Sequence, residues 1–436
     1  MKKTRDIILE VSKRKYHVPN PFLYFIYYIV GRTHLLGAKY HPKYEIVDKL
    51  PKKGPAFIIW NHQSRRDHTF ICTGAWPRRV NIVCEYNEFF RGHLHWALKM
   101  NQILPKKPFC LGDIAGIKAM TSIIKQGGIV ALSPEGNSSN FGDNQPIVPG
   151  TGKFLKHFGV PIYCADIRGS YLTNNKISEE DRIGKVSYKQ YLLFSPEDLK
   201  NMTPEEIEDK INLTFKMDDY EYNKTARIKF KPSKKGGMAT NLHDMCFKCP
   251  KCHEEFSMIA EKDEIKFLKC GNGATLDQYY DFHPFDDSCI IPESPLKWVE
   301  QERMDIIKDI RKDDNYSMSF DVNVGMLPRD HYLKGHATSE PYSKGKVTID
   351  HSGFHYRGTK LDNTEHNIDI DWKYLYTFNI PTDLTYFAIY VKEEYVEFNP
   401  TERVTVKALL LVEEMHRLHV NQWKNFPWYD YMYDIK

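Results

Sequence analysis

The sequence has no apolar stretch long enough to cross a bilayer, which would require about 20 consecutive apolar residues. The nearest segment, PFLYFIYYIV at residues 21–30, is short and aromatic. An excess of charge of one sign is lacking as well, because 61 basic and 57 acidic side chains leave a net charge of +4 over 436 residues. This balance argues against a nucleic-acid-binding protein, and we expect no nucleic-acid partner.

A secretion leader is not expected either, because charged residues occur throughout the first twenty positions. The nine cysteines are an odd number in a long chain and do not indicate a disulfide framework. Internal repeats and low-complexity tracts are also missing. We therefore predict a globular cytoplasmic protein, peripheral on the inner face of a membrane if its substrates are lipids.

The first part of the chain alternates short apolar segments with helical patterns. One helix is predicted from the N-cap Asp113 to Gly127, and another begins at Thr203, which forms a capping box with Glu206. This succession predicts an α/β fold, a mostly parallel sheet covered by helices, over residues 1–240. The predicted strands are AFIIW (56–60), VNIVC (80–84), GIVALS (128–133) and VPIYCADI (160–167).

Three further segments are predicted beyond this domain. Residues 245–285 hold a cysteine cluster in a small zinc-ribbon-like module, and residues 295–312 are predicted to form one connecting helix. Residues 316–436 change to a series of strands that ends in a helical segment, Val404 to His419. A β-rich domain capped by one C-terminal helix resembles the pleckstrin-homology-like (PH-like) fold.

The segment NHQSRRDHTF at residues 61–70 follows a predicted buried strand. His62 and Asp67 are five residues apart, which is about 140° around a helix, so they cannot share one helical face. They can meet if His62 lies in the turn before a helix and Asp67 in its first turn. Ser64 as the N-cap would place Asp67 at the third helical position and produce this arrangement.

A histidine–aspartate pair can act as a general base. The carboxylate holds one ring nitrogen, and the other nitrogen removes a proton from an attacking hydroxyl. The structural alternative is a capping box of Ser64 and Asp67, with Asn61 and His62 as ordinary turn residues. The spacing alone leaves both interpretations open.

Two more blocks follow in order, PEGNSS (134–139) and the strand that begins at VPI (160–162). With NHQSRRD, they resemble the glycerolipid acyltransferase superfamily, typified by 1-acylglycerol-3-phosphate acyltransferase, over roughly residues 40–230. The resemblance implies transfer of a fatty acyl group from acyl-CoA or acyl carrier protein to a lysoglycerolipid hydroxyl. The favoured acceptor is 1-acylglycerol 3-phosphate, the product is phosphatidic acid, and catalysis needs no cofactor.

The same resemblance assigns roles to individual residues. His62 would be the general base and Asp67 its orienting partner, while Glu135, Gly136 and Asn137 would line the acceptor site. The remaining residues assigned to substrate binding are Ser64, Lys106, Lys107 and Arg168.

The sequence departs from the family where the acceptor's phosphate would bind. Ser138 stands where the family has an arginine, and the second arginine position falls in NQILPKKPFCLGD, which offers only Lys106 and Lys107. Arg168 or Lys153 would have to compensate. An acceptor without a phosphate is therefore an alternative.

Two interpretations of residues 21–30 stay open. The segment is either an interfacial helix that brings the site to lipid substrates or a buried core helix.

The cysteine cluster predicts a metal site. CFKCPKC supplies Cys246, Cys249 and Cys252, and LKCGNG supplies Cys270, whereas Phe267 stands where a second knuckle would begin. We predict a structural zinc ion held by the four cysteines. The alternative is a degenerate ribbon without metal; His253 competes with Cys246 for the fourth bond, and a catalytic zinc lacks an acid–base partner.

Two functions therefore remain. The intact His62–Asp67 pair favours an acyltransferase, whereas the missing arginine favours a non-catalytic lipid-binding or scaffold protein on the same fold.

Overall fold

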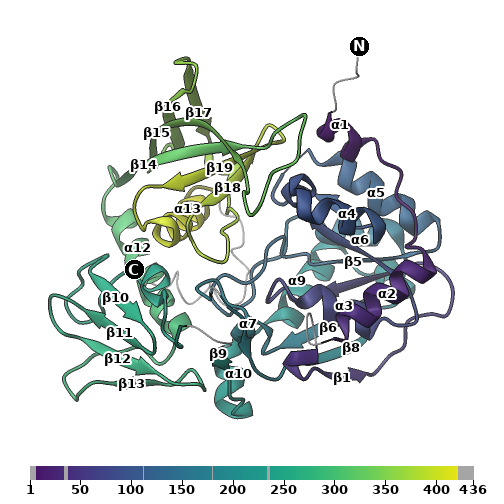
Figure 1. Ribbon diagram of the computed structural model, residues 1–436, viewed down its shortest axis with the longest axis horizontal. Helices are drawn as coiled ribbons and strands as arrows, with labels where there is room; N and C mark the ends of the chain where they lie inside the picture. Colours follow the sequence, from purple (N-terminus) through teal and green to yellow (C-terminus); the bar gives the residue numbers. More distant parts are fainter. Residues whose placement is uncertain (1–5, 34–37, 111, 179, 233–235, 421–436) are drawn as a thin grey trace.

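The computed structural model describes residues 6–33, 38–110, 112–178, 180–232 and 236–420. Within these ranges, three β-sheets have four or more strands. Figure 1 shows them as separate bodies, with the largest sheet and its helices on one side of the molecule and the two smaller sheets on the other.

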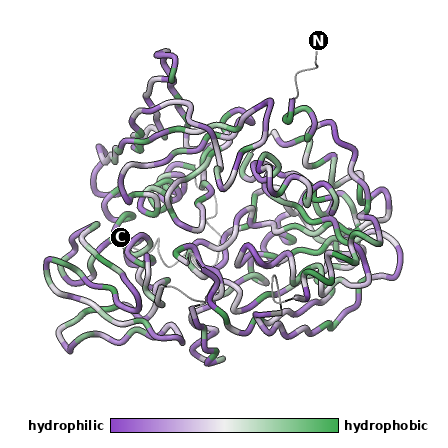
Figure 2. Tube along the Cα trace, viewed as in Figure 1, coloured by the Kyte–Doolittle hydropathy of each residue, from purple (hydrophilic) through white to green (hydrophobic). Residues whose placement is uncertain are grey.

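The centre of the large sheet is β2 (Ala56–Trp60), in which all five side chains are buried. Burial on both faces is typical of a parallel strand covered by helices. Ile58 and Trp60 belong to one apolar core, whereas Phe57 and Ile59 belong to another. The sheet thus separates two cores, and the apolar parts of the chain gather around its central strands (Figure 2).

The strand order of the large sheet is β1-β8-β6-β2-β5-β3-β4. Neighbouring strands are parallel except β6 and β8. The predicted α/β fold with a mostly parallel sheet is therefore confirmed. Its strands are β1 (Lys43–Ile46), β2, β3 (Val80–Glu85), β4 (Leu104–Lys106), β5 (Ile129–Leu132), β6 (Ile162–Arg168) and β8 (Ser187–Phe194).

Helices cover both faces of this sheet. The core with Ile58 and Trp60 includes side chains of α2 (Pro21–Gly31) and α3 (Asp67–Gly74). The opposite core includes α5 (Ile114–Lys125), α6 (Thr151–Phe158) and α9 (Pro204–Phe215). Asp113 caps α5, and Thr203 forms the predicted capping box of α9 with Glu206.

Shorter elements complete this part of the chain. None of the helices in the described ranges is both long enough and apolar enough to span a bilayer. The remaining elements are α1 (Ile7–Ser12), η1 (Ala38–Tyr40), η2 (Tyr86–Phe90), α4 (Gly92–Met100), α7 (Ser170–Thr173), β7 (Arg182–Ile183), α8 (Pro196–Asn201), α10 (Asp219–Ala226), β9 (Lys231–Pro232) and α11 (Leu242–Met245).

A four-stranded antiparallel sheet contains the cysteine cluster. It has the order β10-β11-β12-β13, and α12 (Pro295–Lys312) follows it where the connecting helix was predicted. In Figure 1, α12 lies between this sheet and the C-terminal one. The four strands are β10 (Met258–Glu261), β11 (Glu264–Phe267), β12 (Gly273–Leu276) and β13 (Phe282–Pro284).

The C-terminal region is the predicted β-rich one. Its six-stranded sheet has the order β17-β16-β15-β14-β19-β18 and is antiparallel throughout. One helix, α13 (Thr405–Val420), follows the strands, and most of its side chains are buried. The strands are β14 (Ser317–Met326), β15 (Glu340–Asp350), β16 (Gly353–Lys360), β17 (Glu365–Ile370), β18 (Phe387–Val391) and β19 (Glu394–Pro400), with η3 (Trp372–Tyr374) between β17 and β18.

The PH-like resemblance and the predicted domain limits stay predictions. Residues 233–235 of the predicted linker and 421–436 of the predicted last domain lie outside the described residues.

Polar contacts join the C-terminal sheet to the large sheet. The ammonium of Lys176 is buried and donates to the carbonyl of Ile380 at 2.8 Å. The side-chain amide of Asn379 donates to Glu85 Oε1 at 2.7 Å, at the end of β3. The C-terminal region therefore packs against the carboxyl ends of the parallel strands, where α/β proteins build their sites.

Candidate active site

The turn after β2 is fixed by the amide of Asn61. Its Nδ2 donates to the carbonyl of Ile167 at 2.7 Å, and its Oδ1 accepts from the N–H of Ile167 at 2.8 Å. The side chain thus bonds to β6 as a further backbone unit would, while the main chain turns away. His62 follows at the carboxyl end of the strand, with about a quarter of its side chain exposed.

The structure brings His62 and Asp67 together. Nδ1 of His62 lies 2.9 Å from Oδ2 of Asp67, and the Asp67 carboxylate is fully buried. The helix start differs from the prediction: α3 begins at Asp67 itself, and its N-cap is Arg66 without a side-chain bond. Ser64 as N-cap is therefore wrong. The chain turns before the helix because the Asp67 carboxylate accepts hydrogen bonds from Gln63 and Ser64 in that turn.

Four further donors surround the Asp67 carboxylate. Oδ2 accepts from the backbone N–H groups of Gln63, at 2.7 Å, and Ser64, at 3.0 Å. Oδ1 accepts from the hydroxyls of Ser64, at 3.2 Å, and Ser170, at 2.6 Å. Because an ionised carboxylate can only accept a hydrogen bond, Nδ1 of His62 must be the donor to Asp67 and therefore carries the imidazole proton. The lone pair of Nε2 is then available to take a proton.

The loop with PEGNSS holds the backbone of His62. Oε2 of Glu135 accepts from the N–H of His62 at 2.6 Å, and the N–H of Ser139 donates to the carbonyl of His62 at 2.7 Å. Oε1 of Glu135 accepts from the N–H of Gln145 at 2.8 Å. Burial raises the pKa of Glu135 to about 8, although these backbone bonds oppose the shift. Glu135 positions His62, which is a different role from the predicted lining of the acceptor site.

Gly136 is required by the shape of this loop. Its φ is +77°, and a Cβ there would lie 2.9 Å from the ring of Phe109 and 3.0 Å from Val148. Asn137 uses its Oδ1 to accept from the N–H of Ser138 at 2.8 Å. Both residues therefore shape the turn that carries Glu135.

The cations predicted to bind substrate each contact a carboxylate. Lys106 lies 2.9 Å from Asp113, and Arg168 lies 2.7 Å from Asp166. Lys107 lies 3.2 Å from Glu393, across the contact with the C-terminal sheet. Each of these three cations is thus paired with a different carboxylate.

A second group of cations, missed in the sequence, includes the two arginines of the motif. The basic cluster consists of Lys39, Arg65 and Arg66, whose nitrogens lie 2.7, 3.6 and 3.0 Å from the Asp181 carboxylate. Burial disfavours the charge of Asp181, but the hydrogen bond from Lys39 and the charge of Arg66 lower its pKa to about 2. Three cations around one carboxylate leave an excess of two positive charges. The two adjacent arginines in NHQSRRD were the feature of the sequence that could have indicated this cluster.

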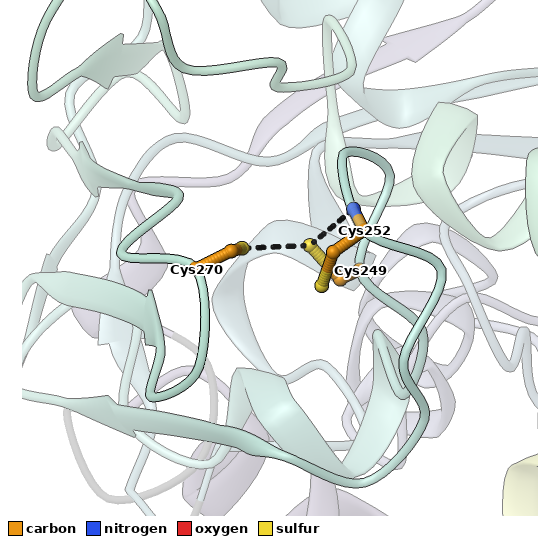
Figure 3. Close-up of side chains that lie close together, drawn as sticks. All are labelled: Cys249, Cys252 and Cys270. Carbon is orange, nitrogen blue, oxygen red and sulfur yellow. Dashed lines mark hydrogen bonds between the residues drawn. The ribbon is translucent and has the colours of Figure 1, made fainter.

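The structure brings together three of the four predicted metal ligands. One ligand atom each of Cys249, Cys252 and Cys270 lies within 4.8 Å of the others (Figure 3). Cys246 is not part of this group, so its assignment as a ligand is wrong. Its side chain follows α11 directly and is fully buried in the apolar core.

Comparison with known proteins supports the assignment of the first region. Residues 41–168 match the family model described as Acyltransferase. The 1-acyl-sn-glycerophosphate (LPA) acyltransferase PlsC from Thermotoga maritima is similar in structure, with 16% identity and a TM-score of 0.38 over 47% of this chain and 79% of that chain. No curated protein matches the sequence.

The matched residues 41–168 contain His62, Asp67 and the loop of Glu135. Residues 41–168 therefore match an acyltransferase domain, and the match includes the blocks NHQSRRD and PEGNSS on which the resemblance was based.

The buried carboxyl of Glu135 predicts a pH-dependent stability. Its pKa of about 8 lies above the ordinary 4.5, so the folded state holds this proton more tightly than the unfolded chain does. The stability that this proton gives is fully present below pH 4.5 and is lost as the pH rises through about 8. A Glu135→Gln variant does not titrate here, so its melting temperature relative to the wild type should rise over this interval.

Glutamine also loses an acceptor for one backbone N–H, which lowers stability by an amount that does not depend on pH. The ionisation of Glu135 is therefore tested only by how the difference between the two melting temperatures changes with pH. A flat difference up to pH 8 would show that Glu135 ionises normally in the folded protein.

Proposed function

We propose that this protein is an O-acyltransferase that moves a fatty acyl group from acyl-CoA or acyl carrier protein to a hydroxyl of a lysoglycerolipid. The favoured acceptor is 1-acylglycerol 3-phosphate, which would give phosphatidic acid. The observation that carries the proposal is the buried Asp67 carboxylate that holds Nδ1 of His62 and leaves Nε2 available as a base.

The reaction follows from this geometry. Nε2 of His62 takes the proton of the acceptor hydroxyl while that oxygen attacks the thioester carbonyl. The new C–O bond forms, the C–S bond breaks, and the thiolate leaving group takes the proton from the imidazolium. Asp67 stabilises the imidazolium in between, and general-base assistance of this kind contributes about 10² to 10⁴ in rate.

The basic cluster supports an acceptor or donor that carries phosphate. Arg65 and Arg66 lie between His62 and Asp67 in the chain, and guanidinium groups suit bidentate phosphate binding. Lys106, Lys107 and Arg168 each pair with a carboxylate of their own, whereas the three cations of the cluster share Asp181. The excess positive charge makes the cluster the better candidate for the role of the missing arginine.

The first test is acyl transfer by the purified protein with labelled acyl-CoA or acyl carrier protein. Lysophosphatidic acid, glycerol 3-phosphate and uncharged lysolipids serve as acceptors. His62→Ala should lower the rate of transfer by at least about 10² while the circular dichroism spectrum is unchanged, because Asp67 keeps its four other donors.

Asp67→Asn should also lower the rate of transfer, because an amide can hold the imidazole in the wrong tautomer.

Label in an uncharged product alone would identify an acceptor without phosphate. Bound acyl chains without transfer to any acceptor would contradict the enzyme and support the lipid-binding protein.

The second test concerns Arg65, whose side chain is half exposed and lies at the longest distance from Asp181. Arg65→Gln should raise the KM for a phosphate-bearing substrate by about tenfold, since a charge-assisted hydrogen bond is worth about 1.5–3 kcal/mol. The KM for an uncharged acceptor should stay the same. Lys200→Gln, an exposed cation on α8, is the matched control. Equal effects on charged and uncharged substrates would reject a phosphate-binding role.

We also propose that α2 docks on a lipid bilayer. One side of the helix packs in the protein: Tyr24 is buried, Tyr28 stacks on Trp76 at 4.3 Å, and Tyr27 contacts His68 of α3. The other side exposes five apolar side chains, Phe22, Phe25, Ile26, Ile29 and Val30. The helix thus combines the two interpretations left open by its sequence.

Charge beside α2 selects an anionic membrane as the partner. A groove of about 600 Å³ adjoins the start of the helix, and Arg14, Arg79 and Lys99 line it together with the exposed Trp96. Basic side chains next to exposed apolar ones match the headgroups and acyl chains of anionic lipids.

Sedimentation with lipid vesicles tests the docking surface. The wild type should bind phosphatidylglycerol vesicles more strongly than phosphatidylcholine vesicles. Ile29→Asp should weaken binding by at least about tenfold, because the apolar burial of one such side chain is worth about 1.5–3 kcal/mol. Leu361→Asp, in the exposed turn after β16, is the matched control and should bind normally. Equal binding by Ile29→Asp would show that another surface meets the membrane.

A further inference from the structure

The three gathered cysteines come from two separate turns. Cys249 and Cys252 lie between α11 and β10, and Cys270 lies between β11 and β12. The sulfurs of Cys249 and Cys270 are 3.6 Å apart. In a tetrahedral zinc site with Zn–S bonds of about 2.3 Å, two sulfurs lie about 3.8 Å apart. The spacing therefore fits ligands of one zinc ion (Figure 3).

Both turns have the same backbone bond. The N–H of His253 donates to the carbonyl of Cys249 at 2.9 Å, and the N–H of Gly271 donates to the carbonyl of Phe267 at 3.1 Å. His253 and Gly271 also share a positive φ, of +62° and +71°. These are two copies of one knuckle, and they differ in the residue that opens each turn.

Phe267 replaces the cysteine that would open the second knuckle. Its side chain is fully buried and stacks on Trp298 with the ring centroids 5.9 Å apart. Within the described ranges, the group of ligating side chains contains Cys249, Cys252 and Cys270 and no fourth residue. His253, which directly follows Cys252, and Cys289 are not part of it.

Donors around Cys249 suit a thiolate. The N–H of Cys252 points to Cys249 Sγ at 3.4 Å, and Nδ2 of Asn272 lies 3.8 Å from the same sulfur. Asn272 is fully buried and is held by the backbone of Ile290, which accepts from its Nδ2 at 2.9 Å and donates to its Oδ1 at 2.8 Å. Such bonds orient metal ligands in closed zinc sites.

We propose that Cys249, Cys252 and Cys270 bind one zinc ion as a three-thiolate site whose fourth position takes water or a small external ligand. Zinc fits because thiolates are soft ligands and the 3.6 Å between the sulfurs of Cys249 and Cys270 matches the spacing in a tetrahedral site. Each thiol loses one proton when it binds, so three protons are released and the site with water carries a net charge of −1.

The ion would link the two turns of a small sheet. The first knuckle also contacts α12, because the indole N–H of Trp298 donates to the carbonyl of Lys248 at 2.9 Å and Glu302 accepts from the N–H of Lys248 at 2.7 Å. Zinc would thus join the β11–β12 turn to the knuckle that packs on α12. A small module of this kind commonly needs such a link.

Metal analysis of the full-length protein, purified anaerobically and desalted after zinc loading, tests the site. The expected content is about one zinc per chain. Cobalt in place of zinc should give the thiolate charge-transfer absorption and the intense visible bands of a tetrahedral site. Cys252→Ser and Cys270→Ser should each lower zinc affinity by at least about tenfold in competition with a chelator. Cys289→Ser is the matched control and should bind as the wild type does.

Circular dichroism and gel filtration of the variants separate loss of metal from loss of fold. If a serine variant does not fold, titration of the wild type with a chelator replaces it, and release of zinc with three newly reactive thiols is then expected. Absence of zinc from a folded wild type would overturn the proposal. A disulfide between Cys249 and Cys270 in anaerobically prepared protein would also overturn it.

Discussion

The buried carboxylate of Asp67 is the constraint around which the acyltransferase region is arranged. A carboxylate without partners in the protein interior is costly, so each donor to it must be held in place. Gln63 and Ser64 supply donors from the turn after β2, and Ser170 supplies one from the start of α7. These bonds tie the ends of β2 and β6 to the first residue of α3, and they leave His62 one orientation.

The contact between His62 and Asp67 could be predicted from the sequence because both residues belong to one turn. Ser170 donates to the same carboxylate but is 103 positions away from Asp67, and Asp181 is 115 positions away from Arg66. Such partners depend on which strands lie side by side, here β2 beside β6, and a local pattern does not encode this. The predicted strands of the large sheet depended on local apolar runs and therefore agree with the structure.

The carboxylate partner of each cation could not be predicted from residue type alone. The resemblance placed Lys106 and Lys107 where a second phosphate-binding arginine was expected, yet their ammonium groups contact Asp113 and Glu393. The start of α3 was predicted two residues too early for a similar reason. A serine with an acidic residue three positions later satisfies the capping-box pattern, but this carboxylate accepts from the Ser64 N–H and hydroxyl and from His62.

Phe109 connects the two large regions of the molecule. Its ring lies against the place where a Gly136 Cβ would be and meets the ring of Tyr376 edge-on at 5.4 Å. If the chain were cut before the C-terminal sheet, this aromatic contact would be lost and Lys176 would lose its acceptor on Ile380. The acyltransferase region is therefore not independent of the C-terminal region: moving it into a shorter protein would require a redesigned surface beside the loop that holds the backbone of His62.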